Sequence, residues 1–237
     1  MIYVVSDIHG CYDRYKKLLN RLKLGEGDTL YVLGDVIDRG ADGFKILLDM
    51  ASRPNIVPLL GNHEAMAIDT ISHFFESIQS DRDIVFSRDA LESMELWFAN
   101  GGAPSLTDFL SLDEKQMQTV WDYLLSMPLY KELSVGGRQF VLVHGGLENF
   151  SPSRPLDDYL PDEILWYRPE SDTAYYPDKY VVFGHTPTRL LCSEFGFKGT
   201  PNKIVQHGRL IDIDCGCAYS GGRLGCLCLD TLKRIYV

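Results

Sequence analysis

Short apolar runs alternate with helical stripes through the first third of the chain. Residues 2–6, 29–33 and 56–60 are rich in β-branched and other apolar side chains, a pattern typical of buried strands. Between these runs, residues 12–23 and 42–52 carry apolar side chains at helical spacing. Strand–helix–strand units of this length predict parallel strands joined by right-handed crossovers. The pattern therefore predicts an α/β fold.

A mainly helical middle follows. Helices are predicted over residues 65–78, 89–99 and 113–126. We interpret the span from about 69 to 130 as a helical cap-like insertion, because it contains none of the polar motifs described below. Substrate preference is expected to depend on this cap. The whole chain, 1–237, is interpreted as a single domain.

Strands return in the second half of the chain. Residues 151–163 are rich in proline and acidic residues and predict a surface loop, and residues 190–206 predict an irregular segment. Short strands separated by tight turns predict a second sheet packed against the first. Strands are expected at residues 139–143, 179–183, 209–214, 224–229 and 233–237.

Polar motifs follow the predicted strands, each at the point where an apolar run ends. Packing does not require these charges, yet the motifs contain four of the six histidines. Ligand sites in parallel sheets lie beyond the carboxyl ends of the strands, so we expect the motifs to converge in space. The motifs are Ser6–Gly10, Gly34–Gly40, Gly61–Glu64, His144–Gly146 and Gly184–Pro187.

The charge balance narrows the classes of partner. The formal net charge is −10 and the sequence pI is about 5.0, and no cluster of lysine and arginine is apparent, so nucleic acid is not expected as a partner. Met1 leads directly into the first strand, without the pattern of a signal peptide. No apolar run approaches the roughly 18 residues of a membrane helix. We therefore expect a soluble, cytoplasmic protein with no membrane partner.

The six cysteines leave two interpretations open. Cys215 and Cys217, like Cys226 and Cys228, form Cys-x-Cys pairs placed in predicted strands, where spacing of two puts both side chains on one face. We interpret them as small buried apolar residues, and a zinc site made of all four is the alternative. Cys11 is likewise expected to pack, with oxidation near a redox-active metal as its alternative.

The motifs supply mixed carboxylate, imidazole and amide ligands. Such ligands suit Mn, Fe or Zn, with Mg also possible, and six of them suit two ions that share a carboxylate. Asp35 is the expected bridge, because its strand is predicted to lie between the other two. Two ions about 3.5–4 Å apart hold a hydroxide for in-line attack on phosphate. The expected metal ligands are Asp7, His9, Asp35, Asn62, His144 and His185.

The remaining polar residues of the motifs suit roles in catalysis and phosphate binding. His63 stands beside Asn62 and is expected to act as general acid to the leaving oxygen. Asp38 is expected to orient His63 and to raise the pKa of its imidazole. Arg39 and Arg168 can bind phosphate oxygens through planar bidentate contacts.

As a set, the five motifs resemble the signature of the calcineurin-like metallophosphoesterases. Asp38-Arg39 and the stretch 166–168 make the chain most similar to the phosphoprotein phosphatase (serine/threonine) branch in its bacterial and phage form. The resemblance implies a four-layer α/β/β/α sandwich and two divalent metal ions, with Mn²⁺ expected. It also implies one metal on Asp7, His9 and Asp35, and a second on Asp35 with the remaining ligands. Ser6 departs from the family's usual glycine, and we expect no loss of function from this change.

Three functions compete at this point. The first is a serine/threonine protein phosphatase that acts on phosphorylated proteins or peptides. The second is a dinucleoside-polyphosphate (diadenosine tetraphosphate) hydrolase acting on a nucleotide substrate, because related sequences share a stretch similar to Trp97–Gly102. The third is a phosphate-binding scaffold without activity, which would require a broken site although every ligand position is filled.

Overall fold

Two five-stranded β-sheets form the centre of the protein, which a computed structural model describes over residues 1–79 and 87–237. In the first sheet, three strands from the first third of the chain run parallel to one another. The last two strands of the chain pair antiparallel with each other, and one of them also pairs antiparallel with the first strand. Side by side, the strands of this sheet are β10 (Lys233–Tyr236), β9 (Gly225–Cys228), β1 (Ile2–Val5), β2 (Thr29–Val32) and β3 (Ile56–Pro58).

The second sheet has three central parallel strands flanked by two antiparallel ones. Side by side, its strands are β4 (Tyr130–Val135), β5 (Arg138–Val143), β6 (Lys179–Phe183), β8 (Leu210–Asp212) and β7 (Val205–His207). The apolar runs predicted for residues 139–143 and 179–183 coincide with the parallel strands β5 and β6. From Phe140 in β5 and from Val181 in β6 to the end of each strand the side chains are buried, because both faces of this sheet are covered there.

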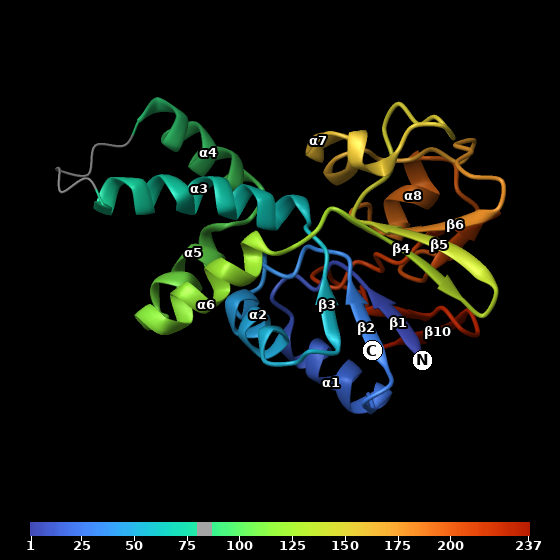
Figure 1. Cartoon of the computed structure of the whole chain (residues 1–237), viewed down its shortest axis with the longest axis horizontal. Helices are drawn as coiled ribbons and strands as arrows, with labels where there is room; N and C mark the ends of the chain where they lie inside the picture. Colours follow the sequence, from blue (N-terminus) through green and yellow to red (C-terminus); the bar gives the residue numbers. More distant parts are fainter. Residues whose placement is uncertain (80–86) are drawn as a thin grey trace.

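Helices cover the outer faces of both sheets and extend beyond one side of the first. The helices are α1 (Tyr12–Leu22), α2 (Gly43–Ala51), α3 (Asn62–Gln79), α4 (Arg88–Ala99), α5 (Ala103–Leu110), α6 (Glu114–Leu125), α7 (Pro161–Leu165) and α8 (Thr188–Glu194). Figure 1 shows α1 and α2 below the first sheet, α7 and α8 on the side of the second sheet, and α3–α6 grouped beside them. The long helix α3 lies along α4 in this group.

Three apolar cores separate these layers. One core lies between the first sheet and helices α1–α6, with Phe44 and Trp97 among its largest side chains. A second lies between the two sheets and contains Val4 and Leu142. The third lies between the second sheet and the helices of its outer face, around Phe183. This arrangement is the expected four-layer α/β/β/α sandwich.

The strand order determines where the polar motifs meet. Strand β2 lies between β1 and β3, as the hydrophobic pattern predicted, so the segment after β2 is central. The parallel strands β1–β3 and β5, β6 and β8 direct their carboxyl ends toward the same edge of the sandwich, where the motifs begin.

Several elements differ from the sequence prediction. Strand β4 was missed because it is an edge strand with mostly exposed side chains, which weakens its apolar signal. Helix α5 begins next to Pro104, which is tolerated in a first helical turn but resembles a break in the sequence. Residues 151–163, predicted as a loop, contain a 3₁₀ turn and the start of α7. The predicted irregular segment 190–206 contains most of α8.

The cysteines are buried or half-buried free thiols. Cys226 and Cys228 lie in β9 and face the helix-covered core, whereas Cys215 and Cys217 lie after β8 and not in a strand. Cys215 packs between the two sheets, on the other side of the sheet from the remaining three. A four-cysteine zinc site therefore does not form. Cys11 packs against the helix-covered core, as expected.

Among the helices of the described ranges, none combines the length and the apolarity needed to cross a membrane.

Helices α1 and α2 are joined by a polar cluster around Asp49. The Tyr15 hydroxyl donates to Asp49 Oδ2 at 2.7 Å, and Arg53 Nε donates to the same oxygen at 2.7 Å. Partial burial raises the pKa of Asp49, but the hydrogen bonds from Arg53 and Tyr15 outweigh it and the pKa falls below its ordinary value.

The Asp49 cluster predicts a pH-dependent contribution to stability. Because the folded pKa of Asp49 lies below the unfolded value, this contribution is complete above about pH 4 and is lost as the pH falls through the folded pKa. Asp49→Asn should lower the free energy of unfolding by about 1 kcal/mol at pH 7, and its difference from the wild type should shrink below about pH 4. Urea unfolding at several pH values measures both quantities.

The control is Asp42→Asn, which changes a more exposed carboxylate that pairs with Lys45 near the start of α2. It should change the free energy of unfolding by less than about 0.5 kcal/mol at any pH. A pH-independent loss in Asp49→Asn would contradict the assignment.

Candidate active site

The five motifs converge at one edge of the sandwich. Asp7 and His9 follow β1, Asp35 follows β2, and Asn62 is the first residue of α3 after β3. From the second sheet, His144 follows β5 and His185 follows β6. All six side chains are buried. The structure therefore brings together every residue predicted as a metal ligand.

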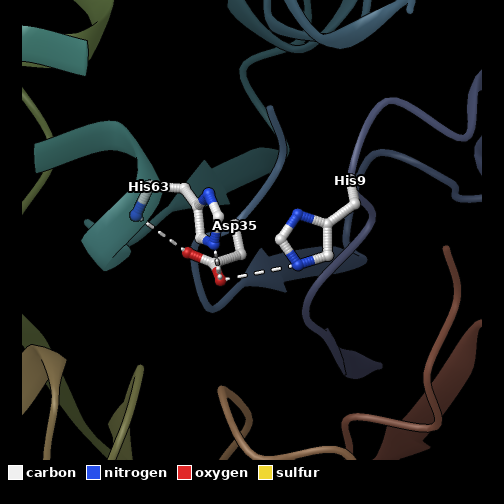
Figure 2. A group of neighbouring side chains, drawn as sticks. All are labelled: His9, Asp35 and His63. Carbon is white, nitrogen blue, oxygen red and sulfur yellow. Dashed lines mark hydrogen bonds and ion pairs between the residues drawn. The ribbon is translucent and has the colours of Figure 1, made fainter. Parts of the chain in front are cut away.

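Asp35 lies at the centre of this group. Its Oδ2 is 3.6 Å from His9 Nε2, and its Oδ1 is 3.3 Å from His144 Nε2. Figure 2 shows the Asp35 carboxylate between the rings of His9 and His63. Its position matches the expected bridging role, because ligand atoms reach it from both sheets.

Backbone carbonyls fix the orientation of two of the imidazoles. His9 Nδ1 lies 2.9 Å from the carbonyl oxygen of Ile37, and His144 Nδ1 lies 2.6 Å from that of Leu33. A carbonyl can only accept, so each Nδ1 carries the proton and each Nε2 presents a lone pair to the site. Histidine metal ligands are held in this way by hydrogen bonds from the other ring nitrogen.

The atoms that face each other across the site are mostly acceptors. His144 Nε2 lies 2.9 Å from Asn62 Oδ1, and no proton is available between these two acceptors. His185 Nδ1 lies 3.0 Å from the same oxygen, and the buried His185 Nε2 has no hydrogen-bond partner in the described part of the chain. A cation would satisfy such facing lone pairs. The residues present therefore fit a divalent metal centre.

Two sets of side chains have ligand atoms within 4.8 Å of one another, and both contain Asp35. One set adds His144 and His185, as predicted for the second metal. The other adds His9 and His63, whereas the prediction placed Asp7 with His9. Asp7 Oδ1 lies 4.0 Å from His9 Nε2, and its carboxylate accepts the backbone N–H of His185.

Burial sets the charge state of the cluster. It raises the pKa of Asp35 well above the usual carboxyl range, and repulsion from Asp7 adds to this shift. It lowers the pKa of His9 and of His185 well below the ordinary imidazole value. The two imidazoles are therefore neutral at pH 7, which is the form that binds metals, and a bound cation would favour the ionised carboxylates.

His63 and Asp38 form a buried pair beside this cluster. His63 Nδ1 lies 2.6 Å from Asp38 Oδ2, as expected for an orienting carboxylate. Burial lowers the pKa of His63, but the charges of Asp35 and Asp38 and the hydrogen bond to Asp38 outweigh it, so the net shift is upward. An imidazole with a raised pKa keeps its proton near neutral pH and can donate it.

The two predicted phosphate-binding arginines border the cluster. Arg39 Nη1 lies 2.6 Å from His9 Nε2, and its Nη2 lies 3.1 Å from His63 Nε2. Arg168 Nη1 donates to the carbonyl of His185 and to Thr186 Oγ1. Within residues 1–79 and 87–237 neither guanidinium is in an ion pair with a carboxylate, so both can accept a phosphate as counter-ion.

Sequence reasoning missed three buried residues of the site. Asp212 is the last residue of β8 and Asp214 follows it at the same edge, and burial raises the pKa of both well above the carboxyl range. The sequence could have indicated both aspartates, because they lie at the end of the strand predicted over residues 209–214, just as the other motifs lie at the ends of predicted strands. Trp97 donates its indole N–H to Asp38 Oδ2 at 2.8 Å. Its position in a predicted cap helix gave no sign of this contact, and the neighbouring Phe98 is 38% exposed.

Unusual backbone conformations concentrate at this edge. Most of the non-glycine residues with positive φ in the described chain belong to the motifs. Such conformations cost free energy and persist where the surrounding structure enforces them, often at functional sites. These site residues, with φ between 46° and 70°, are Asp7, His9, Asp35, Asp38, Arg39 and His185.

Glu64 holds two of the motifs together. Its fully buried carboxylate accepts the backbone N–H groups of Asp35 at 2.8 Å and of Val36 at 2.8 Å, and also that of Gly61 at 3.1 Å. A side chain on Gly61 would collide with the backbone nitrogen of Asp35, at 2.4 Å. Glu64 therefore fixes the segment after β2 against the start of α3.

Comparison with known proteins agrees with this geometry. The family model of calcineurin-like phosphoesterases matches residues 1–206. Serine/threonine-protein phosphatase 2 of Salmonella typhimurium is 29% identical over 173 residues, which cover 70% of this chain and 67% of that protein. A symmetrical bis(5'-nucleosyl)-tetraphosphatase of Acidovorax sp. strain JS42 is 27% identical over 184 residues, 77% of this chain. The match spans only 54% of that relative's length.

Solved structures show the same fold. A protein provisionally described as a diadenosine tetraphosphatase superimposes with a TM-score of 0.66 at 22% identity, covering 100% of this chain and 92% of that chain. A protein serine/threonine phosphatase from Saccharomyces cerevisiae gives a TM-score of 0.59 at 17% identity, covering 95% of this chain and 71% of that chain.

The hydrogen bonds of Glu64 predict that metal binding and stability depend on it. Glu64→Gln places an amide N–H against backbone N–H donors, so the free energy of unfolding should fall by roughly 3 kcal/mol. The affinity for Mn²⁺ should fall as well, because Asp35 loses its fixed position. Urea unfolding and calorimetric titration with Mn²⁺ test the two effects. Glu92→Gln, in an exposed pair with Arg88, should change neither; equal behaviour of the two variants would contradict the role.

Proposed function

Because the chain belongs to the calcineurin-like phosphoesterase family, a family of hydrolases with a dinuclear divalent metal centre, we propose that it hydrolyses phosphate monoesters at the edge described above. The observation that carries the proposal is the set of acceptor atoms whose lone pairs face each other at this edge, because a cation between them would satisfy those lone pairs. When bound, the two ions, Mn²⁺ in our proposal, lower the pKa of water and neutralise phosphate charge. The proposed ligands are Asp7, His9, Asp35, Asn62, His144 and His185.

His63 and Asp38 form the proposed proton donor. The short contact of His63 Nδ1 with Asp38 fixes the ring so that Nε2 faces the metal centre, 3.7 Å from Asp35 Oδ2. The carboxylate stabilises the protonated ring, and the proton on Nε2 passes to the oxygen of the departing alcohol. His63 is therefore assigned as an acid, although its ligand atom also lies near enough to the cluster to reach a metal.

Arg39 and Arg168 are the proposed phosphate-binding residues. Arg39 contacts the imidazoles of His9 and His63, so its guanidinium already lies beside the metal centre and beside the acid. Phosphate oxygens are stronger acceptors than imidazole nitrogens and would replace them. Arg168 approaches from the segment after α7 through its contacts at His185 and Thr186. The two planar donors together orient a terminal phosphate.

We propose phosphoserine and phosphothreonine in proteins as the leading substrate class. The serine/threonine-protein phosphatase 2 of Salmonella typhimurium supports this choice, because the similarity extends over 67% of its length. Two guanidinium groups, Arg39 and Arg168, are also sufficient to bind a single terminal phosphate on a peptide.

The assignments predict distinct losses in two variants. With Mn²⁺, the wild type should hydrolyse p-nitrophenyl phosphate and a phosphoserine peptide. Asp35→Ala should lose bound metal and activity together, whereas His63→Ala should keep its metal and lose roughly 10²–10⁴-fold in kcat on the peptide. Elemental analysis and steady-state kinetics measure these quantities. His207→Ala, an exposed histidine of β7, is the control; full activity in both site variants would refute the assignments.

A dinucleoside tetraphosphate hydrolase is the second candidate, and Arg189 favours it. The guanidinium carbon of Arg189 lies 4.4 Å from the centroid of the Tyr219 ring, and that of Arg39 lies 5.4 Å from the same centroid. Arg189 Nε is buried and has no hydrogen-bond partner in the part of the chain that the structure describes. A third guanidinium beside the reaction centre provides charge for a further phosphate, as in a polyphosphate substrate.

A substrate panel separates the two candidates. Diadenosine tetraphosphate, a phosphoserine peptide and p-nitrophenyl phosphate are compared by kcat/KM in the wild type and in Arg189→Gln. If the second candidate holds, the wild type prefers the tetraphosphate and Arg189→Gln loses about tenfold on this substrate alone. Arg209→Gln is a matched control, because Arg209 stacks in the same way on Tyr180, 5.0 Å from its centroid, at the start of β8. A wild-type preference for the peptide supports the leading candidate.

A further inference from the structure

The cap supplies the groups that hold Asp38 in place. Asp38 follows β2, but besides His63 of α3 its side-chain partners come from α4 and α5. Trp97 Nε1 donates to Asp38 Oδ2 at 2.8 Å and to Oδ1 at 3.0 Å. The backbone N–H of Asp38 donates to Ser105 Oγ at 2.7 Å. The side chains of Trp97, Asp38 and Ser105 are all fully buried.

The next residue is held by the same part of the chain. The backbone N–H of Arg39 donates to the carbonyl of Gly101 at 3.0 Å. Asp38 and Arg39 adopt φ values of 70° and 65°, a region that residues other than glycine rarely occupy. Such a conformation needs support from its surroundings, and the hydrogen bonds that the two backbone N–H groups donate to Ser105 and Gly101 provide it.

The indole ring is itself fixed by a close backbone approach. A side chain on Gly102 would lie 2.6 Å from Trp97 Nε1 and from two further ring atoms. Only glycine therefore lets the turn after α4 lie directly against the indole, which leaves the ring one orientation, with its N–H toward Asp38. This contact explains why Gly102 stands at the end of the Asn-Gly-Gly turn.

A buried carboxylate is stable as an anion only where donors surround it. Asp38 Oδ2 accepts from His63 on one side and from Trp97 on the other, so the indole N–H holds the rotation of this carboxylate. The rotation of Asp38 in turn sets the direction of the His63 ring. Loss of the indole N–H would leave the acid in place but no longer aimed at the leaving oxygen.

We propose that Trp97 is a positioning residue for the proton donor His63. Through Trp97 the cap holds the Asp38 carboxylate in the orientation that fixes the His63 ring, and so completes the active site. This inference rests on the proposed function, in which His63 protonates the leaving group. It assigns to the cap a role in the chemical step, in addition to any role in substrate preference.

The leaving group provides the test. The alkoxide of phosphoserine must receive a proton as it departs, whereas p-nitrophenolate is a stable anion that needs little help. Trp97→Phe removes the N–H donor and keeps an aromatic ring, although the smaller ring fills less of this buried site. Its kcat should fall about tenfold or more on a phosphoserine peptide and less than about threefold on p-nitrophenyl phosphate, with KM unchanged for both. The Mn²⁺ content of the variant should equal that of the wild type.

Two further variants keep the test decisive. Ser105→Ala removes a single oxygen from the support of Asp38 and should show the same selective loss to a smaller extent, even if Trp97→Phe folds poorly. Trp121→Phe makes the same exchange in α6 of the cap and should leave both activities unchanged. Equal losses on the two esters in folded Trp97→Phe and Ser105→Ala would overturn this inference alone. Wild-type inactivity on both esters would overturn the proposed function, and this inference with it.

Discussion

The protein depends on the burial of mutually repelling acceptors at one edge of its sandwich. Carboxylate, imidazole and amide atoms face each other there within hydrogen-bonding distance, yet few protons lie between them. Burial alone would make this arrangement costly, as the raised pKa of Asp35 and the lowered pKa of His9 indicate. Cations remove the cost. The fold is therefore best understood as a scaffold that assembles a cation site from segments far apart in the sequence.

Much of this scaffold could be predicted from the sequence because its signals are local. Apolar runs identified the parallel strands, and polar residues directly after those runs identified Asp7, Asp35 and His144. Convergence then followed from a general property of parallel sheets, whose carboxyl ends meet at one edge. Asp212 and Asp214 carried the same signal and were overlooked, because no histidine or glycine motif accompanies them.

Other features could not be predicted because they arise only when distant segments meet. Nothing around Trp97 indicates that its indole reaches a carboxylate 59 residues earlier in the chain. The edge strand β4 has too few buried positions to give an alternating pattern. Arg189 lies outside the phosphate-binding motifs, and only the shared contact with Tyr219 relates it to Arg39. Both candidate substrates thus depend on side chains whose neighbours are set by tertiary structure.

The place of β9 in the first sheet has a consequence for how the protein forms. Strand β1 pairs with β2 on one side and with β9 on the other, with Tyr3 opposite Cys228. During synthesis the segment carrying Asp7 and His9 emerges first, yet one flank of its strand stays bare until residues 225–228 leave the ribosome. Contacts of such long sequence separation are slow to form. Until then the edge that carries Asp7 and His9 cannot form completely, and β1 keeps one unpaired flank while the residues between β2 and β9 are synthesised.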